Sequence, residues 1–550
     1  MIKDIVVVGG GFAGYITALM LDDVVRKWWN DTTITVIESS KLGTIGVGES
    51  TAQNVPGVLA SLKINPYKFM QETNATFKLA AKFDNWNYEG ESFLHPLMPV
   101  SAIIDTKIKP DNQQPNEQPK VIDPLYAIGM DILYFLANDI PCENVGFNEL
   151  AYENKLPFKY IGEGNYELLK LTSDDDTVIL RAGLDSILGF HMDANLSAKF
   201  LQRICNERNI AILDGKVVDW QLDSETGNLK ELGLEDGTKV KGDFFFDCTG
   251  FRRLLLGEIF KEEYIDYSKW IPQNSVSIIK DGVKYKDGED PKNFTILDAQ
   301  KHGWMFKIPL YNRIGSGYVY SNKFVDDDTI KKEQIEHWKK QGYDVEVDRQ
   351  FSWAPGKFKR SWVKNCFAVG LSEGFVEPLD GNALLLSLTL LKEFLPRYHR
   401  HMLFEGNDVD EFNKIALNAY DHTKNYIYFC HLTKRSDSEY WKYFKEDDNM
   451  PDWIKEKLWL WAQRSPRGYE QLTGQPNPFG LGSWITIGQK SGYSGGHNAV
   501  RDLAVYKFEN EAEQLFNTCK HVKKEVLKHS SPHIDVLKWV NNMNFKGEVK

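Results

Sequence analysis

The 550-residue sequence lacks the features that would place it in a membrane or on nucleic acid. Its most apolar run, residues 383–391, is far shorter than the ~20 residues that a membrane-spanning helix needs. No stretch is rich in Lys or Arg, and the net charge of −11 argues against a nucleic-acid partner. An apolar strand begins at Ile5, so we expect no signal peptide before it and a cytoplasmic location.

Cysteines are few, and they form neither a CxxC pair nor the spacing of a metal site. This pattern excludes a disulfide framework and predicts buried thiols in a reducing compartment, with no bound metal. The six cysteines are at positions 142, 205, 248, 366, 430 and 519.

The clearest feature that is present is an apolar strand, residues 5–8, that runs into glycines. Gly9 allows a tight turn, Gly11 lets the backbone approach a pyrophosphate, and Gly14 lets the next helix pack closely. A second apolar strand, residues 34–37, ends on Glu38, which can accept hydrogen bonds from a ribose hydroxyl. The sequence therefore predicts a dinucleotide site, with the N–H groups at the start of the helix facing the phosphates. Its predicted residues are Gly9, Gly11, Phe12, Ala13, Gly14 and Glu38.

A second glycine-rich turn, Gly46–Thr51, follows soon after the acidic residue and contains Gly48 and Glu49. A flavin is longer than a nicotinamide cofactor and is held along its length, so this turn favours a flavin. An ordinary surface loop is the alternative, because glycine-rich turns are common. Further turns at strand ends extend the flavin interpretation, at Asp247–Arg252, Cys366–Ser372 and Asp380–Ala383.

Helix and strand signals alternate up to about residue 385, and the remainder is mostly helical in pattern. We therefore predict an α/β fold with an interleaved substrate-side β-sheet, divided into residues 1–385 and a helical part, residues 386–550. Locally, we expect a helix from Thr51 to about Ala81, strands within residues 217–247 joined by a turn at Glu235–Gly237, and exposed loops at residues 105–124 and 465–482.

Two segments carry residues suited to chemistry. Phe77–Trp86 contains Lys78 and Lys82 in an apolar setting, where a lysine either reaches the surface along its stem or is a buried functional amine. Gly303–Pro309 is a predicted strand with Trp304 and Phe306 on one face.

With Gly46–Thr51 and Phe375–Leu379, these segments make the chain resemble the flavin-dependent halogenases, particularly the tryptophan-halogenase group. The likeness covers nearly the whole chain. Its most specific part is Phe77–Trp86, which matches the family's FK-x3-KF-x-NW segment with the catalytic lysine at Lys78. Asp247–Arg252 and Arg435–Trp441 match two further family segments.

The resemblance implies an FAD-binding, Rossmann-like flavin-monooxygenase fold and the halogenation of a small electron-rich aromatic substrate. FADH2 from a separate flavin reductase, O2 and a halide (chloride, bromide or iodide) would yield hypohalous acid through a flavin C4a-hydroperoxide. Lys78 would direct this species, and an acid, assigned to Asp380, would remove the proton of the ring intermediate. Homo-oligomers are common among relatives. The remaining implied positions are Val217, Leu371 and Leu384 beside the flavin, Asn382 and Ala383 for halide, and Trp304, Phe306 and His95 on the substrate side.

The sequence also departs from the family pattern. Asp380 replaces a glutamate and is one methylene shorter, and Phe306 replaces the second tryptophan of the signature. Asp380 could instead be a helix N-cap, with Glu377 as the acid. Lys78, His95 and Trp304 each have a purely structural interpretation. Two other functions stay open: a flavin monooxygenase that hydroxylates without using halide, and a flavin-binding protein that is not an enzyme.

Overall fold

The computed structural model describes the following parts of the chain: residues 2–28, 31–41, 48–106, 124–170, 178–180, 183–397, 407–466, 470, 477–493 and 496–545. The chain folds into two compact units, each made of three segments. Unit 1 consists of Met1–Ala75, Met192–Ser275 and Phe351–Lys424, and unit 2 of Thr76–His191, Val276–Gln350 and Asn425–Lys550.

Unit 1 is built on a six-stranded sheet whose centre is the strand that opens the chain. The strand order is β13 (Ala211–Asp214), β2 (Thr33–Glu38), β1 (Asp4–Val8), β17 (Phe244–Asp247), β26 (Cys366–Ala368) and β25 (Trp362–Val363), all parallel except β25. Continuous apolar runs such as Ile5–Val8 form its central strands, because a parallel sheet is covered on both faces.

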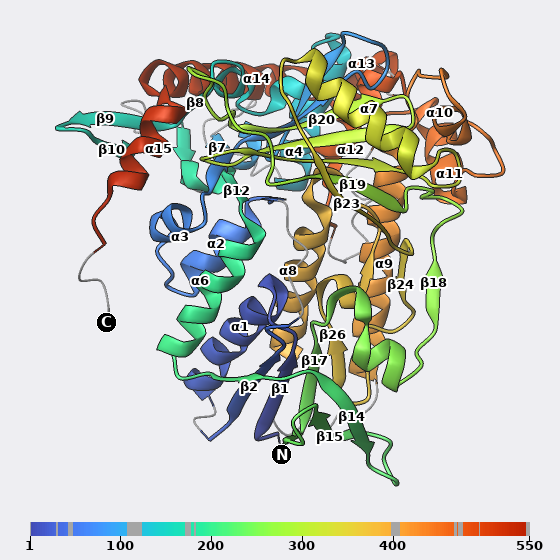
Figure 1. The fold of residues 1–550 in the computed structure, drawn as a ribbon. Coiled ribbons are helices and arrows are strands. Elements are labelled where there is room, and N and C mark those ends of the chain that lie inside the picture. Colours follow the sequence, from blue (N-terminus) through green and yellow to red (C-terminus); the bar gives the residue numbers. More distant parts are fainter. Residues whose placement is uncertain are drawn as a thin grey trace, which may run out of the picture. The chain divides into compact units, whose positions relative to one another are not determined.

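One face of this sheet is covered by helices and the other by a small antiparallel sheet. Helices α1 (Phe12–Trp28) and α6 (Ala194–Glu207) pack together along the first face (Figure 1). The second face shares a core with β14 (Val217–Leu222), β15 (Leu229–Leu234) and β16 (Lys239–Lys241). The predicted turn at Glu235–Gly237 joins β15 to β16, with Gly237 in the left-handed region (φ 87°).

Unit 2 contains a seven-stranded sheet. Its order is β23 (Val347–Ser352), β19 (Ser275–Ile279), β22 (Ile314–Tyr320), β21 (Gly303–Pro309), β20 (Phe294–Gln300), β5 (Ala80–Asp84) and β6 (Ser92–Pro96). Helix α7 (Asp327–Lys340) lies across one face, where Gln334 bonds to Ser277 of β19 (Figure 1). The opposite face therefore stays available for the aromatic side chains of β5, β6 and β21.

The remaining elements are mostly helical after residue 382, as predicted. In unit 1 they are β3 (Glu49–Ser50), α2 (Asn54–Ser61), α3 (Pro66–Glu72), β18 (Tyr264–Asp266), β24 (Gly356–Phe358), β27 (Gly374–Phe375) and α8 (Asn382–Phe394). Helix α9 (Asn407–Cys430) continues from unit 1 into unit 2. Unit 2 adds β4 (Thr76–Lys78), β7 (Ile104–Thr106), α4 (Pro124–Ala137), α5 (Asn148–Tyr152), β8 (Lys155–Leu156), β9 (Phe158–Gly162), β10 (Asn165–Leu168), β11 (Val178–Leu180), β12 (Gly189–Met192), α10 (Glu439–Tyr443), α11 (Asp452–Trp461), α12 (Leu481–Ser491), α13 (Gly496–Tyr506), α14 (Glu509–His529), β28 (Ser531–Pro532) and α15 (His533–Asn542).

The predicted helix from Thr51 to Ala81 is wrong in its second half. Two short helices, α2 and α3, end at Glu72, and Asn74 then takes a left-handed conformation (φ 50°) that stops helix growth. The chain continues as β4, because Thr76–Lys78 pairs with Gly189–His191. A partner strand distant in sequence thus overrides the local helical spacing.

Other predictions have mixed outcomes. All six cysteines are buried free thiols, as expected. The predicted boundary at residue 385 falls inside α8, within unit 1, so the two units differ from the two predicted parts. Most of the predicted loops at 105–124 and 465–482, and Gly46–Val47, lie outside the described residues. Of the helices in the described ranges, none combines the length and apolarity needed to cross a membrane.

Buried histidines make unit 2 sensitive to acid. Burial lowers the pKa of His431 to about 4 and that of His533 to about 3, from 6.5. Between pH 6.5 and these values the unfolded chain binds protons that the folded chain does not, so the free energy of unfolding falls as the pH falls. We expect the free energy of unfolding, measured with urea, to be lower at about pH 5 than at about pH 7.5. His431→Gln removes one of these groups, so the variant should take up at most one proton fewer on unfolding and show a smaller difference. An equal loss of free energy of unfolding in the variant would contradict a contribution of His431.

Candidate active site

The glycine turn after β1 is shaped for the close approach of a phosphate. Gly9 has φ 126° and donates from its N–H to Ile37 O at 2.7 Å. A Cβ on Gly14 would overlap the Gly9 carbonyl oxygen, so the start of α1 needs glycine there. A Cβ on Gly11, in contrast, would meet no atom within 4 Å. Open space thus faces the helix N-terminus at Phe12 and Ala13, which fits the pyrophosphate of a dinucleotide.

Glu38 lies at the carboxyl end of β2, next to this turn. Its carboxylate accepts hydrogen bonds from the Tyr15 hydroxyl and from Gln202 Nε2. Burial, together with the Glu38 carboxylate, raises the pKa of Tyr15 well above its usual value of 10, so Tyr15 remains a donor. Two carboxylate oxygens have about four acceptor positions, which leaves capacity for a ribose hydroxyl.

Two other predicted turns meet at the same edge of the sheet. Strand ends Val8, Asp247 and Ala368 are in register, and Gly250 N donates to Ser372 Oγ at 2.8 Å. A Cβ on Gly370 would lie 3.3 Å from Ala13 Cβ. The turns after β17 and β26 therefore join the start of α1, as a crevice at the carboxyl ends of parallel strands requires.

The remaining residues predicted beside the flavin also belong to unit 1. Val217 is buried at the start of β14, and its carbonyl accepts from Arg252 Nη2 at 3.2 Å. Leu371 and Leu384 are partly exposed, in the turn after β26 and the first turn of α8. Gly48 precedes β3, where burial raises the pKa of Glu49 to about 7.

The turn before α8 has an unusual backbone. Asp380 (φ 58°) and Gly381 (φ 69°) are both left-handed, and a Cβ on Gly381 would overlap Ser50 O of β3. Gly381 occupies the N-cap position without a side-chain cap bond, so the N-cap interpretation of Asp380 is wrong. Asn382 Nδ2 instead donates to the carbonyls of Glu377 and Leu379. The side chain of Asn382 thus closes the turn, and the N–H groups of Asn382 and Ala383 lie at the helix N-terminus.

Lys78 is the most buried lysine of the two motif segments. It ends β4, is 0% exposed, and shares one side of this strand with Thr76. Its cross-strand neighbour on β12 is Gly189, which has no side chain to compete for space. Lys82, by contrast, is 24% exposed and pairs with Asp84 at 2.9 Å. Of the two lysines of Phe77–Trp86, only Lys78 is buried.

The face of the seven-stranded sheet opposite α7 carries the predicted substrate-side residues. Register places Phe306, Leu297 and Phe83 side by side on it, with His95 beside Ala81. The rings of Trp304 and Phe306 are 6.2 Å apart, and Trp304 is fully buried. Gly317 leaves room under Phe306, because a Cβ there would lie 2.5 Å from Phe306 Cζ.

Two motifs far apart in the sequence join in unit 2, a contact that sequence reasoning missed. Arg435 bonds to Asp437, and its Nη1 donates to Asn85 O at 3.2 Å. The Trp441 ring lies 5.6 Å from the Trp86 ring and under the Arg435 guanidinium. Arg435–Trp441 thereby holds the end of the Phe77–Trp86 segment.

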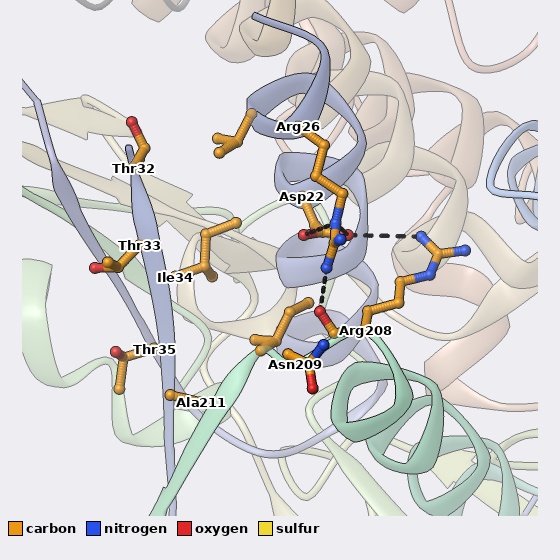
Figure 2. A pocket seen from close by; sticks show the side chains of 11 residues that line it. Asp22, Arg26, Thr32, Thr33, Ile34, Thr35, Arg208, Asn209 and Ala211 are labelled. Atoms are coloured by element: carbon orange, nitrogen blue, oxygen red, sulfur yellow. Dashed lines mark hydrogen bonds and ion pairs between the residues drawn. The ribbon is translucent and has the colours of Figure 1, made fainter. Parts of the chain in front are cut away.

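A cavity of about 460 Å³ in unit 1 lies elsewhere. It is lined by the starts of β2 and β13, at the opposite ends of these strands from Glu38, and by the ends of α1 and α6. Figure 2 shows Asp22 between Arg26 and Arg208, at 2.7 and 3.9 Å, so its carboxylate is balanced by two guanidiniums. The cavity is lined by none of the predicted site residues.

The fold and the motifs define the class of protein. The tryptophan halogenase of Shewanella frigidimarina matches 99% of this chain and 98% of its own with a TM-score of 0.81 at 22% identity. BrvH, a flavin-dependent halogenase from Brevundimonas sp. BAL3, matches 98% and 99% with a TM-score of 0.76 at 25% identity. The fold is the FAD-binding, Rossmann-like flavin-monooxygenase fold of flavin-dependent halogenases, as predicted.

Sequence comparison identifies the family. The model of the tryptophan halogenase family matches residues 4–108 and 178–504. The chain is 30% identical over 469 residues to the tryptophan 7-halogenase KtzQ of Kutzneria sp. (strain 744), covering 81% of this chain and 79% of KtzQ. It therefore belongs to the tryptophan halogenase family and is a flavin-dependent halogenase.

Proposed function

We propose that this protein uses FADH2, O2 and a halide to halogenate a small electron-rich aromatic molecule, with Lys78 directing the halogen. The observation that carries this proposal is the full burial of Lys78 within the Phe77–Trp86 segment. A lysine usually keeps its ammonium group in water, so a position with 0% exposure is rare and favours a functional amine over a surface lysine. An amine there can hydrogen-bond hypohalous acid and orient it toward one ring carbon.

Unit 1 supplies the groups that would hold the cofactor. The N–H groups at Phe12 and Ala13 face the open space at Gly11, and Glu38 accepts from the ribose. Gly48, Glu49, Val217, Leu371 and Leu384 complete the proposed set. Reduced FAD, when bound, supplies with O2 the oxidising power that converts halide to hypohalous acid. We expect a separate flavin reductase to deliver it, and we propose a cytoplasmic, homo-oligomeric enzyme.

Asp380 is the proposed acid. A carboxylate can stabilise the positive charge that develops on the ring during electrophilic attack and then accept the ring proton. Asp380 is buried in a turn with a left-handed backbone. Trp304, Phe306 and His95 would line the substrate side.

The halide is proposed to bind at the N-terminus of α8, on the N–H groups of Asn382 and Ala383. Asn382→Ala removes both side-chain bonds to the turn, so we expect roughly tenfold weaker halide binding. Bromide titration followed by the absorbance of bound FAD measures this. Asn413→Ala is the control, since Asn413 is also buried in unit 1 but bonds to Trp362. Equal weakening in both variants would contradict a local role of Asn382.

Mass spectrometry of reaction products tests the function. The purified protein is supplied with FAD, a flavin reductase, NADH and O2, and chloride, bromide and iodide are tried separately on phenols, indoles and anilines. A halogenated product that disappears in Lys78→Ala supports the proposal and ranks the halides. A product that is only oxygenated would establish the monooxygenase alternative, and FAD binding without any product would favour the non-enzyme.

A further inference from the structure

A buried hydrogen-bond network surrounds His191 on β12. His191 is 0% exposed, and its Nδ1 lies 3.0 Å from Thr76 Oγ1 while its Nε2 lies 2.9 Å from Thr295 Oγ1. Thr76 Oγ1 in turn donates to Pro309 O. Three elements meet in this way: β4, which carries Lys78, strand β20, and the end of the central strand β21, which carries Trp304 and Phe306.

Counting hydrogens defines the state of the imidazole. The Thr76 hydroxyl has one hydrogen, which goes to Pro309 O because a carbonyl can only accept. Thr76 Oγ1 must therefore accept from His191, so the proton of His191 is on Nδ1. In the neutral ring, Nε2 then accepts from the Thr295 hydroxyl.

The surroundings of His191 keep it neutral. Burial, and then the nearby charges of Lys78 and His533, lower the pKa of His191 well below 6.5. A neutral His191 adds no second positive charge next to the buried Lys78.

The strand that carries Lys78 is short. It comprises only Thr76–Lys78, and its ladder partner is the equally short Gly189–His191. His191 lies opposite Thr76, and Lys78 lies on the same side two residues further along. The bonds of His191 and Thr76 connect this short strand pair to β20 and β21.

We propose that His191 is a positioning residue for Lys78. As a neutral imidazole of defined tautomer, it connects β4 by hydrogen bonds to β20 and β21, the strands of the substrate face. His191 itself touches no reacting atom in this scheme. This inference rests on the proposed function for its catalytic consequence. Its structural content can be tested without flavin, halide or turnover.

The first test is the tautomer. In protein labelled with ¹⁵N-histidine, the His191 signals are identified as those missing from His191→Gln. We expect Nδ1 to carry the proton and Nε2 to carry none, unchanged between about pH 6 and about pH 8. A proton on Nε2 alone, or titration of His191 within this range, would overturn the proposal.

The second test reads Lys78 directly. Cyanate carbamylates amines, and peptide mass spectrometry gives the rate at Lys78 in the flavin-free protein. His191→Phe keeps a ring but loses both bonds, so we expect the strand to loosen and carbamylation to rise several-fold. His191→Gln retains one donor and one acceptor and is expected to restore a rate close to the native one. Native-like carbamylation in His191→Phe, or no rescue by Gln, would overturn the proposal.

A control separates positioning from general loss of stability. His431→Phe also removes a buried histidine of unit 2, one that bonds to Ile427 O at 2.8 Å. At temperatures where both variants are folded, we expect Lys78 reactivity to change only in His191→Phe. An equal change in both would overturn the proposal. If the native enzyme halogenates, kcat of His191→Phe should fall roughly 10²-fold, because the amine is displaced. If the native enzyme does not halogenate, the proposed function fails but the positioning role of His191 does not.

Discussion

Lys78→Met is expected to lower the rate of halogenated product formation by roughly 10²–10³-fold, the usual cost of removing one donor from a water-excluded site. Methionine is close to lysine in volume and flexible, so it avoids the cavity that alanine would leave. The melting temperature of the variant checks that it is folded. Product is measured by mass spectrometry, and hypohalous acid released into solution is measured with a phenolic scavenger.

Lys82→Met is the matched control. Lys82 belongs to the same segment but is 24% exposed and paired with Asp84. We expect this variant to retain activity within a few-fold. The Lys78 variant should still release hypohalous acid, since the amine acts after the acid has formed. Equal losses of activity in the two variants would mean that Lys78 has only a structural role.

The second large effect is expected at the glycine turn. Gly11→Ala should weaken FAD binding by at least roughly tenfold and leave the melting temperature of the flavin-free protein unchanged. The reason is that a Cβ on Gly11 meets no protein atom within 4 Å and enters the space assigned to the pyrophosphate. Titration with FAD, followed by flavin fluorescence, gives the affinity, and calorimetry of the flavin-free protein gives the melting temperature.

Gly14→Ala provides the contrast. Its Cβ would overlap the Gly9 carbonyl oxygen, so α1 must move away from β1. We expect this variant to lose both FAD affinity and stability, by about 1–3 kcal/mol for an overpacked site. If Gly11→Ala bound FAD as tightly as the native chain, the phosphate would have to lie elsewhere.

Local signals were sufficient for the cofactor end of the fold. The strand, the glycines and Glu38 each act on neighbouring residues, so their order in the sequence already implies β1, the turn, α1 and β2. The family motifs identified Lys78 in the same way. Its burial confirms that this segment enters the core.

The missed features depend on partners distant in sequence. Strand β4 forms because β12 pairs with it, and no spacing within residues 51–81 reports that partner. The Asn382 side chain turns back to the carbonyls before it, which excludes Asp380 as a side-chain cap. The partners of His191, Thr76 and Thr295, are each more than a hundred residues away in the sequence, so no local pattern reports the network.

The packing of His533 has a consequence for synthesis on the ribosome. His533, at the start of α15, lies 6.4 Å from the ring of Phe77, the residue before Lys78. At about 5–20 residues per second, the ~450 residues between Lys78 and His533 take roughly 20–90 s to make. During that time Phe77 lacks part of its cover, so the nascent chain exposes β4, the strand that carries Lys78. A chaperone that binds apolar segments should therefore engage ribosome-bound chains that end before α15 and release the finished chain once it has left the ribosome.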